Sequence, residues 1–175
     1  MKKRWDWLAS IIKKNNFKIG AEVGCSVGVT TSFLLRNCPG LFLYAVDLWE
    51  CRASVLSDRA FEVLKNYDFD EITKLFNKRT RPYENRLKVL KGVSWEMAQY
   101  VDDCSLDFVF IDADHSYESV AKDIRAWTPK LKKGGILSGH DLLYEGVNRA
   151  VNELINIWVD TKVNQVWYCH KEDVK

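Results

Sequence analysis

Apolar residues recur along this chain with two different spacings, and the two spacings alternate. Trp5, Leu8, Ile11 and Ile12 lie three or four residues apart, which predicts an amphipathic helix that ends near Asn15. Short, nearly unbroken apolar runs predict buried strands at residues 19–23, 41–46, 87–90, 106–111 and 136–139. Helical patterns are found at residues 30–36, 95–101, 116–127 and 146–157, and at about 55–66 and 70–79.

This alternation predicts a fold class. Strands that are apolar on both faces and separated by helices are typical of a parallel sheet that is covered on both sides. The last two strand patterns, 159–163 and 165–170, have no helix between them, so one of the two should run antiparallel. We therefore expect an α/β, Rossmann-like, doubly wound sheet of seven strands, mostly parallel, with helices on both faces and the last strand antiparallel.

Length and composition restrict the classes of protein further. A chain of 175 residues predicts one domain spanning 1–175, in which residues 48–86 are the longest connection and a candidate lid or substrate-selecting insertion. No apolar run approaches the roughly 18 residues of a membrane span. The five cysteines are widely spaced and form no CxxC pair, which argues against a zinc ribbon or a disulfide scaffold. We expect a cytoplasmic protein that does not enter the membrane.

A glycine-containing turn follows the first predicted strand, in the segment Glu22-Val-Gly-Cys-Ser-Val-Gly28. Small residues there let a ligand lie against the backbone. Asp47 ends the second predicted strand nineteen residues after Gly28, where a carboxylate can accept hydrogen bonds from ribose hydroxyls. The turn lacks the GxGxxG spacing of dinucleotide binders and has no basic residue to meet a phosphate. These features predict an adenosine-type, cationic and phosphate-free ligand.

A second motif, LDFVFIDADHSYESVAKDIRAWTPKLKKGGILSGHDL, covers residues 106–142. Together with the turn and Asp47, it resembles the class I S-adenosylmethionine-dependent methyltransferases, and in particular small bacterial members with an IDxDHSYE block. That group includes sugar and natural-product O-methyltransferases. The sequence departs from the usual glycine turn at one position, where Ser26 takes the place of the middle glycine.

The resemblance implies S-adenosylmethionine as the cofactor and a set of residues that bind it. These residues are Glu22, Gly24, Cys25, Ser26, Gly28, Asp47, Leu48, Val93, Ser94 and Asp112. The resemblance places the turn around the methionine half of the cofactor and Asp47 on the ribose hydroxyls. It places Leu48, Val93 and Ser94 around the adenine. Asp112 is implied to lie near the methionine amino group or the reacting methyl.

Acidic and imidazole groups follow the fourth and fifth predicted strands, and they allow two mechanisms. In one, Asp112 and Asp141, with His140, bind a divalent cation such as Mg²⁺ that lowers the pKa of a substrate hydroxyl. The flanking His140 and Leu142 argue against Mg²⁺, because hard cations prefer oxygen ligands. In the other, His140 or His115 acts as a general base without a metal, beside Asp141.

The acceptor implied by the resemblance is a hydroxyl of a small molecule or sugar. The basic segment 74–91 leaves a nucleic-acid methyltransferase as an alternative, although a formal net charge of +2 does not require a polyanionic partner. A catalytically silent partner subunit that binds the cofactor is another alternative. The short additions to the fold leave the acceptor pocket open, which favours either a large substrate or closure by a second subunit. We expect a homodimer.

Overall fold

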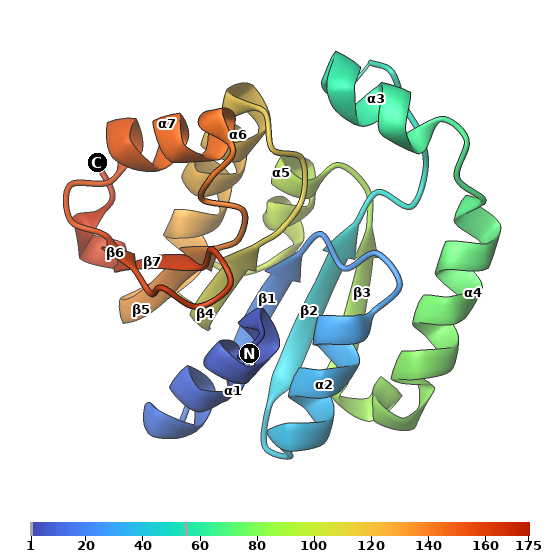
Figure 1. Ribbon diagram of the computed structural model, residues 1–175. Coiled ribbons are helices and arrows are strands. Elements are labelled where there is room, and N and C mark those ends of the chain that lie inside the picture. Colours follow the sequence, from blue (N-terminus) through green and yellow to red (C-terminus); the bar gives the residue numbers. More distant parts are fainter. Residues whose placement is uncertain (1, 55) are drawn as a thin grey trace.

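A twisted sheet of seven strands runs through the centre of the molecule, in the order β3-β2-β1-β4-β5-β7-β6 (Figure 1). The computed structural model describes residues 2–54 and 56–175. The strands are β1 (Ile19–Val23), β2 (Phe42–Asp47), β3 (Leu87–Lys91), β4 (Leu106–Ile111), β5 (Leu131–Gly139), β6 (Val159–Asp160) and β7 (Trp167–His170). Strands β1 to β5 are parallel, and β7 runs antiparallel to β5 and β6. The predicted seven-stranded sheet with an antiparallel last strand is confirmed.

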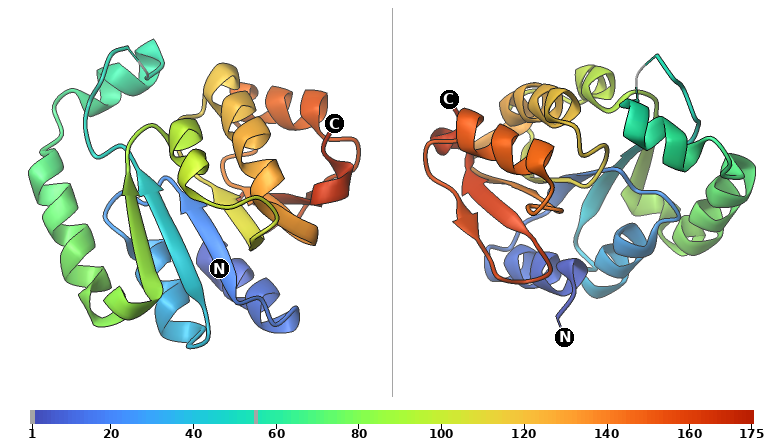
Figure 2. Two further views of the ribbon diagram at one scale, coloured as in Figure 1. Left: turned by 180° about the vertical axis from the view of Figure 1, so that it is seen from behind. Right: turned by 45° about the horizontal axis from the view of Figure 1, so that its top comes forward.

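Helices cover both faces of the sheet (Figure 2). One face carries α1 (Arg4–Lys14) and α2 (Val29–Asn37), and the other carries α5 (Ser94–Met97), α6 (Tyr117–Trp127) and α7 (Glu145–Leu154). Helix α4 (Phe69–Thr80) packs beside α2 at the β3 edge, while α3 (Asp58–Leu64) lies beyond the strand ends (Figure 1). Among the described residues, no helix is both long and apolar enough to cross a bilayer.

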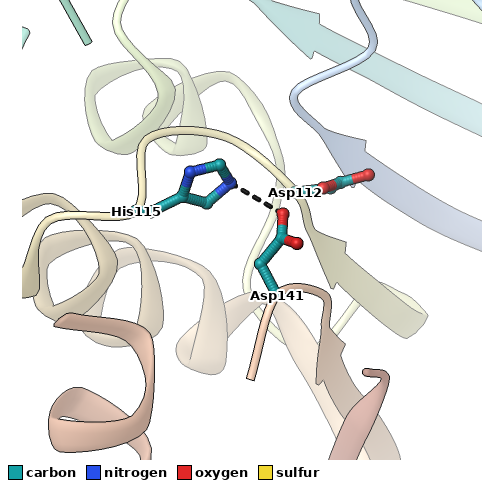
Figure 3. A group of neighbouring side chains, drawn as sticks. All are labelled: Asp112, His115 and Asp141. Carbon is teal, nitrogen blue, oxygen red and sulfur yellow. Dashed lines mark ion pairs between the residues drawn. The ribbon is translucent and has the colours of Figure 1, made fainter. Parts of the chain in front are cut away.

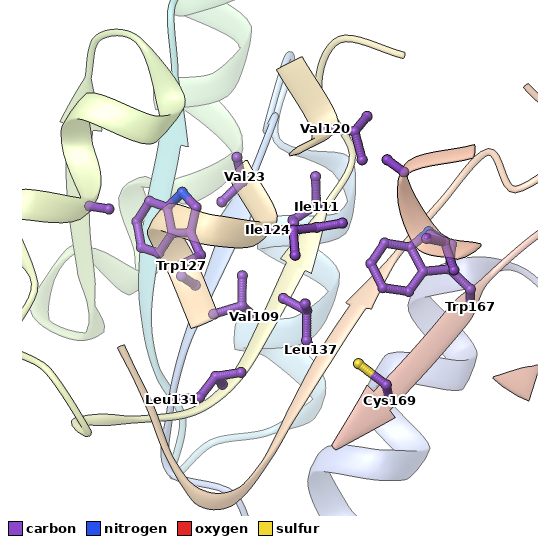
Figure 4. Close-up of a cluster of buried hydrophobic side chains, with 14 of the residues drawn as sticks. Val23, Val109, Ile111, Val120, Ile124, Trp127, Leu131, Leu137, Trp167 and Cys169 are labelled. Carbon is purple, nitrogen blue, oxygen red and sulfur yellow. The ribbon is translucent and has the colours of Figure 1, made fainter. Parts of the chain in front are cut away.

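Alternate residues of the strands supply two apolar layers. Val23, Val109 and Leu137 face α5, α6 and α7, where Trp127 and Trp167 are almost completely buried (Figure 4). On the opposite face, strand residues pack against α1 and α2 in a second apolar layer. The strands supply Leu43, Phe108 and Phe110, and the helices supply Leu8, Ile12, Leu34 and Leu35. Burial on both faces explains why the strands appear in the sequence as nearly continuous apolar runs.

Several element boundaries differ from the sequence prediction, among them that of β6, which covers only Val159–Asp160 of the predicted 159–163. The helix predicted to reach residue 157 ends at Leu154, because Ile155 is extended and pairs with Val174. The fifth strand begins at Leu131 instead of residue 136, since a register shift opposite Leu106–Phe108 lets it continue past Gly134. The helix predicted at about 55–66 is α3, and the predicted first residue, Val55, lies outside the described residues.

The strand order reverses between the parallel neighbours β1 and β4, because the chain continues from β1 to β2 on one side and from β4 to β5 on the other. Ligands of open α/β sheets bind at such a switch point, beyond the carboxyl ends of the strands. Backbone hydrogen bonds hold these ends together: Asp112 N–H donates to Val23 (2.7 Å), and His140 N–H donates to Ile111 (3.0 Å). We call this border the carboxyl edge of the sheet.

Candidate active site

The connection from β1 to α2, residues 24–28, is called the β1–α2 turn below, and it lies in the middle of the carboxyl edge. Gly24 has a φ of 93°, and a Cβ there would lie 2.1 Å from the carbonyl oxygen of Asp112. Gly28 has a φ of 76°, and a Cβ would lie 2.8 Å from the Phe76 ring. The turn is therefore held against the end of β4 on one side and against α4 on the other.

Asp47 ties the end of β2 to this turn. Its Oδ2 accepts from the Ser26 N–H (2.7 Å) and its Oδ1 from the Trp49 N–H (3.0 Å), while the Trp49 indole donates to the Ser26 carbonyl (2.9 Å). Burial raises the pKa of Asp47, and the backbone hydrogen bonds oppose that rise. The carboxylate is half-buried, and its two oxygens offer about four acceptor positions. Acceptor capacity therefore remains for hydroxyl groups of a ligand.

Glu22 lies beneath the turn and away from solvent. The Thr31 hydroxyl of α2 donates to its Oε2 at 2.6 Å, and the residue is 2% exposed. Burial raises the pKa of Glu22 to about 8, so the side chain is neutral at neutral pH. The contact between Glu22 and α2 therefore fixes the base of the turn.

The other residues predicted around the cofactor have distinct local environments. Cys25 is buried, its thiol donates to the Glu22 carbonyl (3.3 Å), and burial raises its pKa, which keeps it unreactive. Leu48 is half-buried after β2, and Val93 is buried at the start of α5. The Ser94 hydroxyl donates to Asp123 of α6 at 2.5 Å. Ser94 therefore anchors α5, and its hydroxyl is engaged in this bond.

Two aspartates and two histidines meet where β4 and β5 end, and Figure 3 shows three of them, Asp112, His115 and Asp141. Asp141 Oδ2 lies 2.8 Å from His115 Nε2 and 3.0 Å from His140 Nδ1, and Asp112 Oδ1 lies 3.5 Å from His140 Nδ1. The His115 side chain is 38% exposed, whereas that of His140 is 9% exposed. The ring of His115 stacks on Tyr144 at 4.5 Å between centroids. His115 is accordingly the histidine that a ligand can reach.

The two histidines of this cluster differ in how far their neighbours raise the pKa. Burial opposes the charged form of His140, but its contacts with Asp112 and Asp141 prevail and raise its pKa to about 9. The hydrogen bond to Asp141 raises the pKa of His115 above its ordinary value, against a smaller effect of burial. Burial would raise the pKa of Asp141, but both histidines hold it well below its usual range. At neutral pH, His140 is a buried cation between two carboxylates.

Asp112, His115 and Asp141 each offer one ligand atom, and these three atoms lie within 4.8 Å of one another. Two carboxylates and one imidazole suit Mn²⁺ or Zn²⁺ better than Mg²⁺. The sequence-based metal set contained His140 in place of His115. The cavity behind the cluster, lined in part by His140 and Trp167, measures about 10 Å³ and is too small for an organic ligand.

Several contacts at the carboxyl edge come from residues that the sequence pattern did not single out. Arg4 Nε of α1 lies 2.9 Å from Asp112 Oδ2. Asp114 accepts from the backbone N–H and the hydroxyl of Ser57 at 2.9 and 3.1 Å, and the Arg59 guanidinium lies 5.0 Å from the Tyr144 ring centroid. Tyr144, which follows His140 and Asp141 closely in the sequence, was the one local sign that an aromatic side chain belongs to this site.

Two arginines of the basic segment 74–91 have structural contacts. Arg86 donates to the carbonyls of Leu35, Cys38 and Leu41 and so caps the end of α2, and Arg79 donates to Val27 at 2.7 Å. The segment also lines an open groove of about 630 Å³. That groove lies between α4 and β3, where it includes Leu87, the first residue of β3. It is thus away from the carboxyl edge.

A family profile described as "Methyltransferase domain" matches residues 21–142, which is more than half of the chain. This span includes the β1–α2 turn, Asp47 and the Asp-His cluster. No curated protein sequence matches the chain.

The fold is similar to those of many solved structures. An O-methyltransferase from Bacillus cereus in complex with S-adenosylhomocysteine is 14% identical, with a TM-score of 0.66 over 95% of this chain and 80% of that chain. An O-methyltransferase from Streptomyces achromogenes involved in tomaymycin synthesis, in complex with S-adenosylmethionine, is 12% identical, with a TM-score of 0.69 over 95% and 79%. The methyltransferase PaMTH1 from Podospora anserina, bound to S-adenosylhomocysteine, is 11% identical, with a TM-score of 0.67 over 96% and 78%.

At these identities the structural likeness establishes the fold, and the profile match establishes the family. Both confirm the resemblance that the glycine turn and the segment 106–142 indicated. The chain belongs to the methyltransferase-domain family and is a class I S-adenosylmethionine-dependent methyltransferase.

Proposed function

We propose that this protein methylates a hydroxyl group of a small molecule or sugar, with His115 as the general base. The observation that carries the proposal is the hydrogen bond between His115 Nε2 and Asp141 Oδ2, 2.8 Å long, at the carboxyl edge beside the β1–α2 turn. It gives a half-exposed imidazole a fixed orientation next to the predicted cofactor site. Such a pair is suited to taking a proton from an alcohol.

The predicted cofactor residues fit an adenosine-type group in this structure. The β1–α2 turn exposes backbone at two left-handed glycines, and Asp47 keeps acceptor capacity at the end of the neighbouring strand. We assign the turn to the methionine half of the cofactor and Asp47 to its ribose hydroxyls. Leu48 and Val93 are assigned to the adenine, which Ser94 meets through its backbone.

His115 would act through Nδ1, because Nε2 holds the hydrogen bond to Asp141. Asp141 stabilises the imidazolium that forms when His115 accepts the proton from the acceptor hydroxyl. His140 is already protonated and buried, so its role is to position Asp141 and Asp112. A bound S-adenosylmethionine would supply the methyl group as an electrophilic carbon with a neutral thioether as its leaving group.

A metal-assisted reaction is the second candidate, and the convergence of Asp112, His115 and Asp141 favours it. These residues would hold a divalent cation that stabilises the deprotonated acceptor hydroxyl. His115 would then be a ligand instead of a base.

We also propose that residues 50–68 select the acceptor. Helix α3 has no buried residue, yet Ser57 bonds to Asp114 and Arg59 lies against Tyr144, which stacks on His115. The rest of the longest connection, in α4, is packed into the fold through the buried ring of Phe76. The candidate lid, predicted as 48–86, is therefore narrowed to its first half.

Calorimetric titration tests the cofactor assignment. We expect S-adenosylmethionine and S-adenosylhomocysteine to bind, NAD not to bind, and the Asp47→Ala variant to lose most of its affinity. Absence of binding by the wild-type protein would reject the assignment.

A methyl-transfer assay against phenols, sugars and other alcohols tests the base. His115→Gln should lower kcat by about 100-fold or more with unchanged cofactor affinity, while His170→Gln, at an exposed histidine in β7, is the matched control. Chelator treatment separates the two candidate mechanisms: activity that survives it rejects the metal, and activity that disappears and returns with Mn²⁺ rejects the metal-free base.

A further inference from the structure

Arg4 brings a positive charge from the first helix to the carboxyl edge of the sheet. It is the first residue of α1, and its backbone N–H donates to Asn164 Oδ1 (3.2 Å), which holds the start of the helix beside the loop between β6 and β7. Its Nε lies 2.9 Å from Asp112 Oδ2 at the end of β4. A residue at the start of the chain thus reaches the predicted methyl-transfer site.

This ion pair is close but incompletely hydrogen-bonded. Arg4 Nε is buried and has no hydrogen bond of good geometry among the described residues. The side chain is 29% exposed, compared with 12% for Asp112. Within residues 2–54 and 56–175, Asp112 is the one acidic group in ion-pair contact with Arg4. A guanidinium carries five N–H donors, so Arg4 has donors left for a second anionic partner.

The pair also lies directly beside the β1–α2 turn. The Asp112 carbonyl oxygen is 2.1 Å from the position that a Cβ on Gly24 would take, so the backbones of the turn and of Asp112 are in contact. The proposed function places the methionine half of the cofactor at this turn. That half ends in an α-ammonium and an α-carboxylate, whose charges are opposite to those of Asp112 and Arg4.

We propose that Arg4 binds the α-carboxylate of the cofactor, while Asp112 binds its α-ammonium. The inference rests on the proposed cofactor site. On binding, the contact between Arg4 and Asp112 opens, and each charge pairs with one end of the amino-acid group. The exchange leaves no buried charge unpaired, which is the condition under which ion pairing in a half-buried site is favourable. Arg4 is suited to the task because its planar donors match the two oxygens of a carboxylate.

The experiment compares two ligands that differ by one carboxylate. S-adenosylhomocysteine and its decarboxylated analogue, which keeps the adenosine, the thioether and the amino group, are titrated calorimetrically into the wild type and three variants. Arg4→Met removes the charge, Arg4→Lys keeps it without the planar fork, and Lys13→Met removes an exposed charge near the far end of the same helix.

We expect the wild type to bind S-adenosylhomocysteine at least about 10-fold more tightly than the decarboxylated analogue. Arg4→Met should abolish that preference by weakening S-adenosylhomocysteine alone, Arg4→Lys should retain part of it, and Lys13→Met should retain all of it. A structural role of Arg4 would weaken both ligands equally, and that result would overturn the inference.

Two further outcomes would count against the proposed role of Arg4, in different ways. An unchanged preference in Arg4→Met, or a wild type that binds both ligands equally, overturns the inference and leaves the cofactor site standing. A wild type that binds neither ligand overturns the cofactor site, and the role of Arg4 falls with it. If Arg4→Met fails to fold, the wild-type comparison and Arg4→Lys still decide the question.

Discussion

Replacing Glu22 by Gln tests whether the acidic residue beneath the β1–α2 turn is neutral in the folded protein. The substitution keeps the size of the side chain and an oxygen that can accept the Thr31 hydroxyl, and it removes the charge. If Glu22 were ionised in the folded protein from pH 5 upwards, as it is in the unfolded chain, the effect of Glu22→Gln on stability should not change with pH. If it is a buried neutral acid, the substitution should stabilise the protein at alkaline pH.

The magnitude follows from the displaced pKa. The unfolded chain releases this proton near the ordinary pKa of 4.5, whereas the folded protein holds it up to about 8. The folded state therefore binds more protons in between, and the stability that Glu22 contributes is lost as the pH rises from 4.5 through 8. The full loss corresponds to about 4 to 5 kcal/mol above about pH 8. Gln titrates in neither state, so the variant should show none of this loss.

Urea unfolding followed by tryptophan fluorescence, at pH values from about 5 to 8.5, measures the difference. We expect the two proteins to be similar near pH 5 and the variant to be more stable by a few kcal/mol near pH 8. Glu96→Gln, at an exposed glutamate in α5, is the control and should change little at any pH. Parallel stability curves for wild type and Glu22→Gln would refute a neutral Glu22, as would a variant that is less stable at every pH.

Four shorter predictions concern other parts of the site. Burial raises the pKa of Asp123 to about 7, so its stability contribution is lost as the pH rises through that value, and Asp123→Asn should be more stable than the wild type in urea unfolding near pH 8. Ser26 has a left-handed φ of 46°, so Ser26→Gly should raise the unfolding free energy by roughly 1 kcal/mol in the same assay. His115 must be neutral to act as a base, so the acid limb of kcat should have a midpoint above the ordinary 6.5, and His115→Gln should lack that limb. Arg59→Ala should raise the KM for the acceptor and leave calorimetric cofactor affinity unchanged, because the guanidinium lies against Tyr144 and not at the turn.

The fold could be predicted from the sequence because its elements are specified locally. Ile19–Val23 and Leu106–Ile111 have the bounds that their apolar runs indicate, since both faces of those strands are buried. Boundaries were wrong where a distant segment decides them. Helix α7 stops at Leu154 because Val174 pairs with the next residue, and nothing near Leu154 in the sequence signals that contact.

The residues of the candidate site likewise fall into those that the sequence predicts and those that only long-range packing determines. The turn, Asp47 and the Asp-His pairs follow the ends of strands, so the topology alone gathers them at one edge. The reach of Arg4 depends on how α1 packs, which its helical pattern does not specify. Burial likewise distinguishes His140 from His115, although both follow apolar strands in the sequence. Long-range packing, and not local pattern, therefore decides which histidine a ligand can reach.

The balance of charges at the carboxyl edge determines how the two candidate mechanisms can be told apart. Asp112 and Asp141 carry two negative charges, and Arg4 and the protonated His140 match them without a cation. A divalent cation held by the two carboxylates would weaken their contact with His140, lower its pKa and release its proton. Metal binding near neutral pH should therefore release protons.

Calorimetric titration of Mn²⁺ in two buffers of different ionisation enthalpy measures this release. Binding whose heat changes with the buffer, in a protein whose activity is lost with chelator, would establish the metal-assisted reaction. Buffer-independent binding would mean that Mn²⁺ displaces a proton from neither His115 nor His140, so the group of Asp112, His115 and Asp141 would not be its site. Full activity after chelation, with no binding, would leave the charge balance as it stands and His115 as the base.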